Sequence, residues 1–477
     1  MQKTPDLVLT EREPDTTLTH WLYSELRRAI LEGRLPRRAP LPPTRMLAQT
    51  YKLSRRIVVN VFDQLRDEGY LTARVGAGTT VSDSIPEDFL PSPRKRTPQQ
   101  PPSPRIETGD FYRRPVRPFR PIEPALSEFP IAIWARLTAR ATRGASTALL
   151  AGGDAAGYRP LREAIAAHLG STRGVACSPD HIVITSGTQQ SLDLLSRTVL
   201  RPGDAVWIED PAYTDAADAF RSTGARVVPI PVDEHGMRVH PAQTKKQLPK
   251  AVYLTPAHQF PLGASLRLDR RLDLLQWTRR HGIAIFEDDY DSEFRFSGKP
   301  VPAMKGLSGA GHVFLLGTFN KSMFPALRLG YIIAPDAWLD AVLRVRRLMD
   351  RYPAALPQSA LAAFLAEGHY TKHLRRMREL YGTRLESLRT EVNRHLAGVL
   401  ALPEIQAGLN TPAFLLNENL SSGRAVALAQ QHNVEAWPLD RFAIARKDLR
   451  GLVLGFAAFN EREIRSGVTA LARALVS

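Results

Sequence analysis

The stretch that decides the fold of most of this chain is VFLLGTFNKSMFPALRLGY, residues 313–331. It opens with an unbroken apolar run, as in strands that are buried on both faces of a parallel sheet. Lys321 follows this run, and its apolar neighbours are Phe319, Met323 and Phe324. Burial lowers the pKa of a lysine, and a neutral amine can condense with an aldehyde. We therefore expect Lys321 to hold an aldehyde and Arg328 to bind a phosphate. Taken alone, the stretch also fits a lysine and an arginine on a surface loop.

Six further apolar runs recur around this stretch. They lie at 182–184, 205–208, 227–232, 251–254, 283–286 and 330–333. Helical patterns separate several of them, as at 191–199 and 270–281. Alternating strands and helices predict an α/β domain with a largely parallel sheet. In such a domain, ligands bind at the carboxyl ends of the strands.

Two more motifs follow predicted strands and fit the same kind of ligand. Thr185–Gln189 lies between a strand and a helix, where free backbone N–H groups bind anions, although a simple helix cap is commoner. Glu287–Glu293 is rich in acids but lacks the glycine and the spacing of a calcium loop. A carboxylate beside a phenol, as in Asp288 and Tyr290, can instead hold a pyridinium nitrogen and a ring hydroxyl. The strand-end motifs therefore converge on one kind of ligand.

The first 82 residues follow a different pattern. Apolar residues recur at helical spacing up to Gly33, a second short helix opens near Thr44, and Ser54 is a good N-cap for a third. Two strands around a glycine turn at 76–78 follow. This order predicts a winged helix-turn-helix, whose third helix places its N-terminal side chains in the major groove of DNA. The alternative is a three-helix module that binds another protein.

Basic residues concentrate in this first region. The whole chain has 64 Lys and Arg against 48 Asp and Glu, a net charge of +16. Nine basic residues and one acid, Glu32, lie between residues 27 and 56. Phosphate neutralisation supplies much of the affinity for DNA, whereas a solvated face is the less specific alternative. The residues expected to contact DNA are Arg45, Ser54, Arg55, Arg56, Gly76 and Gly78.

Length and composition limit the remaining possibilities. A chain of 477 residues with 43% hydrophobic and 23% charged residues is typical of a folded protein of two or three domains. We expect no membrane span and no secretory signal, because no apolar run is long enough for either. The single cysteine, Cys177, excludes an internal disulfide and fits a cytoplasmic protein without a metal site.

A proline-rich segment separates the two regions. Eleven prolines lie within 83–124. Proline fixes φ and lacks a backbone donor, so this segment is expected to be an extended tether. The expected organisation is a DNA-binding domain at 16–82, a linker at 83–124 and a large domain at 125–477.

The motifs of both regions resemble known families. The first region resembles the GntR family of bacterial regulators in Leu41–Ala48, Leu53–Arg55, Gly69–Leu71 and Arg74–Thr79. The second resembles the aminotransferase-like domain of fold-type I pyridoxal 5′-phosphate proteins in 157–162, 255–261, 287–295 and 317–321. Together they resemble the MocR subfamily over nearly the whole chain outside the linker. The resemblance implies a winged helix fused to a large α/β domain with a smaller C-terminal α/β subdomain.

The same resemblance implies roles for individual side chains. Lys321 would form the Schiff base with pyridoxal 5′-phosphate. Asp288 would pair with the pyridine nitrogen, Tyr290 with the ring hydroxyl, and Tyr213 would stack on the ring. The phosphate would be held by Gly187, Thr188, Thr318 and Arg328. Fold-type I domains build this site at a dimer interface, so a homodimer that reads paired operator half-sites is implied as well.

Several positions depart from the transaminase pattern. Phe260 replaces an Asn that contacts the ring hydroxyl, and Asn320 replaces the Ser that precedes the lysine. Gly152 replaces a Tyr that contacts the phosphate across the dimer. Val453 stands where transaminases place the arginine for the substrate carboxylate. Arg450 is near, but an odd shift along a strand turns a side chain to the other face. Without a carboxylate anchor, an amino acid is poorly positioned, so we expect little or no transaminase turnover.

Three functions remain open at this point. We favour a DNA-binding transcriptional regulator that senses pyridoxal 5′-phosphate, with room for an amino-compound effector. The first alternative is an active aminotransferase with a DNA-binding appendage, which Val453 and the winged helix disfavour. The second is a DNA-binding protein whose large domain only dimerises, which Lys321 and its surroundings disfavour.

Overall fold

The computed structural model describes residues 9–10, 12, 16–74, 78–86, 117–239, 248–297 and 302–476. The chain forms two compact units, 1–111 and 112–477. Each unit has a hydrophobic core of its own.

The first unit consists of three helices and a β-hairpin. Its elements are α1 (Leu18–Leu31), α2 (Thr44–Thr50), α3 (Arg55–Asp67), β1 (Leu71–Arg74) and β2 (Gly78–Val81). The centre of the core is formed by the fully buried Leu22, Leu26, Val58, Val61 and Leu65. These residues follow the helical spacing that places one apolar stripe against the core. The predicted cap is confirmed, because the Ser54 hydroxyl accepts a hydrogen bond of 3.3 Å from the Ile57 amide at the start of α3.

The hairpin is tied to the segment between α1 and α2. This segment, 39–41, lies beside β2 and pairs with it through an isolated bridge between Pro40 and Thr80, and the Leu41 amide donates to the Thr79 carbonyl at 2.8 Å. Gly78 begins β2 with a φ of +81°, a conformation that glycine adopts without strain. The other glycine predicted for this turn, Gly76, lies outside the described residues. The hairpin is therefore held close to the start of α2, as a wing requires.

The second unit is built on an eight-stranded sheet with the order β3-β10-β9-β8-β7-β4-β5-β6. Its strands are β3 (Ile182–Thr185), β4 (Ala205–Asp210), β5 (Arg226–Asp233), β6 (Gly236–Met237), β7 (Ala251–Leu254), β8 (Ala284–Asp289), β9 (Val313–Thr318) and β10 (Gly330–Ile333). The pairs from β9 through β8, β7 and β4 to β5 are parallel. Strand β10 runs antiparallel between β3 and β9, and β6 runs antiparallel to β5. All seven runs predicted as strands form strands, and the sheet is mixed rather than wholly parallel.

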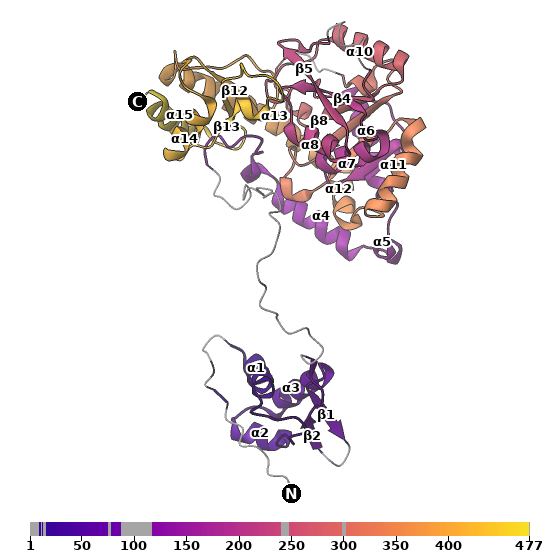
Figure 1. Ribbon diagram of the computed structural model, residues 1–477, viewed down its shortest axis with the longest axis vertical. Helices are drawn as coiled ribbons and strands as arrows, with labels where there is room; N and C mark the ends of the chain where they lie inside the picture. Colours follow the sequence, from indigo (N-terminus) through magenta and orange to yellow (C-terminus); the bar gives the residue numbers. More distant parts are fainter. Residues whose placement is uncertain are drawn as a thin grey trace. The chain divides into compact units, whose positions relative to one another are not determined.

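Helices cover both faces of this sheet (Figure 1). The helices of this part of the unit are α4 (Ile131–Arg143), α5 (Thr147–Ala151), α6 (Arg159–Arg173), α7 (Thr188–Val199), α8 (Thr214–Ser222), α10 (Leu268–His281), α11 (Asp336–Met349) and α12 (Ala355–Ala366). Helices α7, α8 and α11 pack on strand residues such as Ile208 and Leu316. Alternate residues, such as Ile184 and Leu315, face α6 and α12 instead, because strand side chains alternate between faces. No helix in the described part of the chain is long and apolar enough to cross a bilayer.

The C-terminal part forms a smaller α/β subdomain. Its elements are α13 (His369–His395), β11 (Leu400–Ala401), β12 (Asn410–Leu415), α14 (Ser422–Gln431), β13 (Trp437–Pro438), β14 (Gly451–Gly455) and α15 (Glu461–Val476). The four strands form a sheet with the order β11-β12-β14-β13, and α13 packs against α15. Val453 lies in the middle of β14, opposite Pro412 and Trp437.

Residues 117–125, most of which the sequence predicts as linker, pack on the second unit, and we name them the strap. Phe119 is fully buried, and its carbonyl accepts from the Gly455 amide at 2.9 Å. A Cβ atom on Gly455 would lie 2.0 Å from the Arg120 carbonyl oxygen, so only glycine allows this approach. The end of the predicted linker is therefore part of the fold, whereas its residues 87–116 lie outside the described ones.

The polar ends of several strands meet at one edge of the large sheet. Because β10 reverses between β3 and β9, strand β3 regains the direction of the parallel strands. The last residues of β3, β4, β8 and β9 are Thr185, Asp210, Asp289 and Thr318. The ligand motifs predicted from the sequence all follow strands that end at this edge.

Candidate cofactor site and nucleic-acid interface

Lys321 lies just beyond β9, where the chain leaves the sheet. Its side chain is half-buried, and Nζ donates to the Ile122 carbonyl of the strap at 3.2 Å. Burial lowers the pKa of Lys321 to about 8, although Glu123 and Asp291 nearby oppose this shift. A lysine with this pKa has a substantial neutral fraction near neutral pH. The neutral amine is the form that attacks an aldehyde.

Asp288 lies near the end of β8 and has one free oxygen. Its Oδ2 accepts from the Tyr253 hydroxyl on β7 at 2.8 Å. Its Oδ1 is buried and has no hydrogen-bond partner among the described residues. Burial raises the pKa of Asp288 to about 7. Because an unpaired buried oxygen is costly, Oδ1 is suited to accept the N–H of a pyridinium ring.

Tyr290 belongs to a hydrogen-bonded group beside Asp288. Its hydroxyl lies 3.0 Å from His258 Nδ1, which also lies 2.9 Å from Asp291 Oδ2. Burial, reinforced by nearby carboxylates, raises the pKa of Tyr290 well above its usual value, so the phenol stays protonated. His258 and Asp291 were not predicted as site residues from the sequence, although they lie inside the motifs at 255–261 and 287–295.

The first turn of α7 and the loop after β9 form a small cradle. Helix α7 begins at Thr188, and its N-cap, Gly187, has a φ of +119° and no capping side chain. A Cβ atom on Gly187 would lie 2.9 Å from Asn320 Nδ2 and 3.9 Å from Arg328 Nη1. Backbone N–H groups, an amide and a guanidinium therefore converge, as a phosphate site requires.

Backbone geometry explains how this cradle is built. Arg328 has a left-handed φ of +51°, a conformation that is uncommon outside glycine and often marks a functional position. A Cβ atom on Gly330 would lie 2.9 Å from the Gly187 Cα, so glycine is needed there for close approach. The Thr318 hydroxyl accepts from the Asn320 amide at 3.2 Å and so positions the loop. Asn320, noted from the sequence only as a departure, is the cradle residue that the sequence analysis missed.

Tyr213 and Phe260 connect the cradle to the rest of the site. The Tyr213 hydroxyl donates to Gln189 Oε1 on α7 at 3.4 Å. The Phe260 ring lies edge-on to both Tyr213 and Tyr290, with centroid distances of 6.3 Å and 6.0 Å. The structure thus places all eight residues predicted to bind the cofactor at one edge of the sheet, and their individual roles remain predictions.

The opposite side of this site is apolar, and we name it the apolar wall. It consists of the buried side chains Phe260, Leu439, Phe442 and Val453. Val453 is fully buried, and the Phe260 and Phe442 rings lie 4.9 Å apart. Arg450 turns elsewhere, because its Nη1 donates to the Glu418 carbonyl at 2.7 Å. The expectation that Arg450 cannot stand in for an arginine at position 453 agrees with this geometry.

The residues at this edge fit pyridoxal 5′-phosphate. The free Oδ1 of Asp288 can accept a hydrogen bond from the ring nitrogen, and Lys321 can react with the aldehyde. The cradle at Gly187 can bind the phosphate. Across the described ranges, no group of three His, Cys, Asp or Glu side chains is arranged to hold a metal ion. The free Oδ1 of Asp288, Lys321 and the cradle favour an organic cofactor with a ring nitrogen, an aldehyde and a phosphate.

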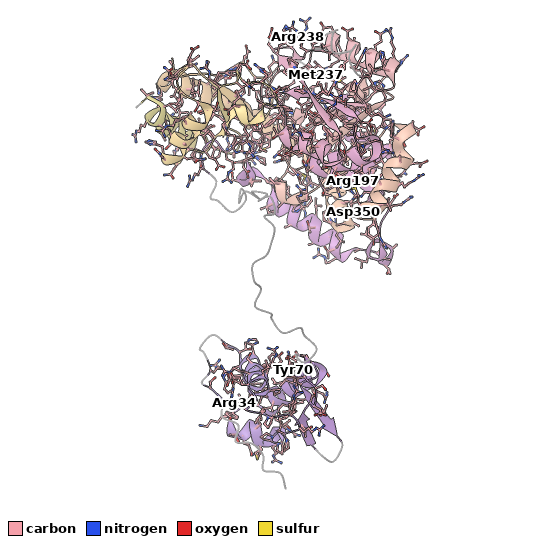
Figure 2. The ribbon with its side chains drawn as sticks, viewed as in Figure 1. Arg34, Tyr70, Arg197, Met237, Arg238 and Asp350 are labelled. Carbon is pink, nitrogen blue, oxygen red and sulfur yellow. The ribbon has the colours of Figure 1, made fainter. Side chains whose placement is uncertain are left out.

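The nine basic residues between 27 and 56 fall into two classes. Those that contact neighbouring protein groups are Arg27, Arg28, Arg34, Arg37 and Arg38. The Arg27 side chain, for example, donates to the hydroxyl of Tyr70, a residue labelled in Figure 2. Those that are exposed and form no ion pair within the described residues are Arg45, Lys52, Arg55 and Arg56. The unpaired cations therefore lie on α2, on the turn after it and at the start of α3, where a winged helix meets DNA.

Comparisons with known proteins match the two units separately. Residues 18–81 match the bacterial regulatory proteins of the gntR family, and residues 127–471 match aminotransferases of class I and II. The "Probable rhizopine catabolism regulatory protein MocR" of Rhizobium meliloti is 37% identical over 99% of this chain and 96% of its own. The pyridoxine biosynthesis regulator PdxR of Corynebacterium glutamicum is 32% identical over 79% of this chain and 78% of its own.

Solved structures similar to this chain include aminotransferases. LysN, an α-aminoadipate aminotransferase from Thermus thermophilus, has a TM-score of 0.70 and 28% identity over 76% of this chain and 92% of its own. It was crystallised with N-(5′-phosphopyridoxyl)-L-leucine. A kynurenine aminotransferase from Pyrococcus horikoshii has a TM-score of 0.70 and 27% identity over 78% of this chain and 92% of its own. The chain therefore belongs to the GntR family as a MocR-type transcriptional regulator, with a winged helix for DNA and an aminotransferase-like domain for pyridoxal 5′-phosphate.

Proposed function

We propose that this regulator changes its binding to DNA in response to pyridoxal 5′-phosphate, and that an amino compound acts as a second effector. The observation that carries the proposal is the hydrogen bond from Lys321 Nζ to the Ile122 carbonyl. Ile122 belongs to the strap, which continues along the chain toward the winged helix. The strap thus connects the predicted aldehyde-binding lysine to the segment between the two units.

The strap is held in place by a few separate contacts. Arg120 Nε pairs with Glu435 Oε2 at 2.9 Å, and the Ala125 amide donates to the Tyr381 hydroxyl at 3.0 Å. Phe119 and Ile122 have left-handed φ values of +72° and +56°. Such conformations cost about 1 kcal/mol or more each and persist only where contacts enforce them. Losing one contact therefore favours rearrangement of the strap.

Cofactor binding would act directly on a further contact of the strap, the hydrogen bond from Lys321 Nζ to the Ile122 carbonyl. When bound, pyridoxal 5′-phosphate supplies an aldehyde that condenses with primary amines. Lys321 then uses its nitrogen for the cofactor and no longer donates in the same way to the Ile122 carbonyl. A ligand shifts a conformational equilibrium only through different affinities for the two states, and this contact provides such a difference.

The second unit also has a surface that suits a second copy of the chain. Ile131, Leu150 and Leu348, on α4, α5 and α11, are large apolar residues that are 65%, 65% and 83% exposed. A hollow of about 890 Å³ lies between α4, α5 and α12. Position 152 of this chain is glycine, whereas the family usually has there a tyrosine that reaches the partner subunit. The Tyr352 ring packs on Gly152, so a tyrosine from another part of the chain is present at this surface. A homodimer would carry two winged helices for paired half-sites.

This proposal places the protein where its DNA is, in the bacterial cytoplasm. The Val453 position offers no carboxylate anchor, so the proposed role is regulation without efficient transaminase turnover. Sustained turnover of an amino-acid and keto-acid pair at about 1 per second or faster would favour the enzyme instead.

Gel-shift titration with the DNA upstream of the protein's own gene tests the proposal. We expect a salt-dependent complex whose affinity or mobility changes when pyridoxal 5′-phosphate is added. An upstream fragment that binds equally well and migrates equally with and without the cofactor would contradict sensing, while leaving DNA binding intact.

A further inference from the structure

The apolar wall and one acid beside it define the chemical class of the second effector. We propose that this effector is a primary amine without a carboxylate, and that Glu123 binds the ammonium or hydroxyl group at its other end. The inference rests on the proposed function, since it names the ligand of the same site. It depends on three features: the position of the wall, the engagement of nearby arginines, and the surroundings of Glu123.

The wall lies directly against the predicted cofactor residues. Phe260 contacts Tyr213 and Tyr290 edge-on, and it packs on Phe442 behind them. Val453 belongs to the same cluster, and Ile122 of the strap packs against it. The Ile122 carbonyl in turn accepts from Lys321 Nζ at 3.2 Å. An amine that reaches Lys321 and its cofactor therefore has the wall as one of its neighbours.

The arginines near the wall are engaged with other groups. Arg450 contacts the Glu418 carbonyl, and Arg446 Nη2 pairs with Asp448 Oδ2 at 2.6 Å. Arg441 stacks over the Trp437 ring at 5.6 Å, and its side chain is exposed. A carboxylate pressed against the wall would lose its hydration without gaining a guanidinium partner. Burying an unpaired carboxylate is strongly unfavourable, so the wall disfavours amino acids.

Glu123, in contrast to the wall, favours a ligand group that carries a positive charge or a hydrogen-bond donor. Its side chain is half-buried, and its carboxylate has no hydrogen-bond partner among the described residues. Arg120, the cation beside it, is paired with Glu435. Burial raises the pKa of Glu123, and Lys321 is the first of the positive groups that oppose this shift. A half-buried acid next to Lys321 therefore lacks a donor that a ligand can supply.

These features together disfavour a carboxylate at the far end of the ligand and favour an ammonium or a hydroxyl group there. A carboxylate would meet the apolar wall and the negative charge of Glu123, whereas an ammonium or a hydroxyl would donate to Glu123. Charge-assisted hydrogen bonds are about twice as strong as neutral ones, so a diamine should bind more tightly than an amino alcohol. The site thus defines the end groups of the ligand rather than its length.

A matched pair of probes tests the inference on the full-length protein loaded with pyridoxal 5′-phosphate. The probes are 1,4-diaminobutane and 4-aminobutyrate, which are similar in length and differ in the end group. Binding is followed through the visible absorption of the cofactor and, independently, through the anisotropy of a labelled operator. We expect the diamine to half-saturate at a concentration at least about tenfold lower, a difference of about 1.4 kcal/mol.

Two substitutions make the test specific to these residues. Glu123→Gln, which keeps the shape of the side chain, should reduce the ratio of the two affinities toward one. Val453→Arg should shift the preference toward 4-aminobutyrate, and Val453→Met, of similar length but uncharged, should not.

The outcomes separate the inference from the proposed function. A wild-type protein with a normal cofactor band that binds 4-aminobutyrate as tightly as the diamine overturns the inference alone. The inference is also overturned if Glu123→Gln leaves the affinity ratio unchanged. A protein with no cofactor band at all overturns both the inference and the cofactor part of the proposed function.

Discussion

The two sides of the cofactor site differ in kind. On one side, the free Oδ1 of Asp288, the low-pKa Lys321 and the cradle at Gly187 supply the polar groups that a pyridine ring, an aldehyde and a phosphate need. On the other, the apolar wall around Val453 consists of buried hydrocarbon, at the position where the resemblance to transaminases implies an arginine for the substrate carboxylate. We therefore expect the site to bind the cofactor without positioning an amino acid for repeated turnover.

Under the proposed function, this difference lets an enzyme fold serve as a receptor. Tight binding of a cofactor requires only that the protein supply partners for the polar groups of the cofactor. Catalysis requires in addition that the substrate be held in a reactive position, and the binding energy for this comes from groups remote from the reacting atoms. Removing one such anchor is enough to separate binding from catalysis. The predictions below test the polar side first, where the largest effects are expected.

The largest effect is expected from Lys321→Ala, compared with Lys305→Met. Burial lowers the pKa of both lysines to about 8, but Lys305 donates to the Val313 carbonyl at 2.8 Å instead of facing the site. Lys321→Ala should abolish the visible band of covalently bound cofactor, and Lys305→Met should keep it. Absorption spectra of the two purified variants decide the matter. Equal bands in both would show that Lys321 does not hold the cofactor.

The next effect concerns Asp288 and its hydrogen-bond partner. Asp288→Asn keeps an acceptor for Tyr253 but removes the charge beside the ring nitrogen. We expect cofactor affinity to fall at least about tenfold, since charge-assisted bonds to buried groups contribute about 1.5–3 kcal/mol. Tyr253→Phe, which removes only the orienting hydroxyl, should weaken binding less. Fluorescence titration with pyridoxal 5′-phosphate measures both, and the reverse order of effects would contradict the assignment.

The same carboxylate should make stability depend on pH in the cofactor-free protein. Burial raises the folded-state pKa of Asp288 to about 7, above its ordinary value, so the folded form binds more protons than the unfolded form at intermediate pH. The stability from this group is present at low pH and is lost as pH rises through about 7. Glu209 and Glu287, with pKa values also raised to about 7 by burial, act in the same direction.

Thermal unfolding at two pH values tests this linkage. The melting temperature of the cofactor-free second unit should be lower at pH 8 than at pH 5.5. In Asp288→Asn the gap between the two temperatures should shrink, because Asn does not titrate. A gap of unchanged size in the variant would show that Asp288 does not take part in this dependence.

The smallest effect is expected on the other unit, in the salt dependence of DNA binding. Arg55 is exposed and unpaired among the described residues, whereas Arg28 pairs with Glu25. Arg55→Ala should lower the slope of log affinity against log salt by about one, as for the loss of one phosphate contact. Arg28→Ala should leave the slope nearly unchanged. Equal changes in slope would mean that the unpaired cations do not define the DNA-facing surface.

Much of this architecture could be predicted from the sequence, because it is encoded locally. Buried strands appear as apolar runs, and the cap of α3 appears as Ser54 before a helical pattern. The partner of Asp288 could not be found in this way, since Tyr253 becomes its neighbour only when β7 pairs with β8. Which strands pair is decided when the sheet assembles, so the sequence around Asp288 or Tyr253 does not indicate that the two side chains become neighbours.

The strap was missed for a different reason. Its prolines resemble those of the preceding segment, and proline spacing alone predicts a tether. Its contacts join residues far apart in the chain, such as Arg120 and Glu435. The residue of the cradle that was missed, Asn320, lies beside Lys321 in sequence, but its place opposite Gly187 depends on how the loop turns at Arg328.

The central claim is that the cofactor at Lys321 acts as a signal to the DNA-binding unit. It is tested most directly by titrating pyridoxal 5′-phosphate into complexes of a labelled operator with wild type, Lys321→Ala and Lys305→Met, while anisotropy and visible absorption are recorded together. We expect operator affinity and the cofactor band to change in parallel in wild type and Lys305→Met, and neither to respond in Lys321→Ala, which should still bind the operator. An operator affinity that responds identically in wild type and Lys321→Ala, or that stays constant while the band of wild type saturates, would contradict it.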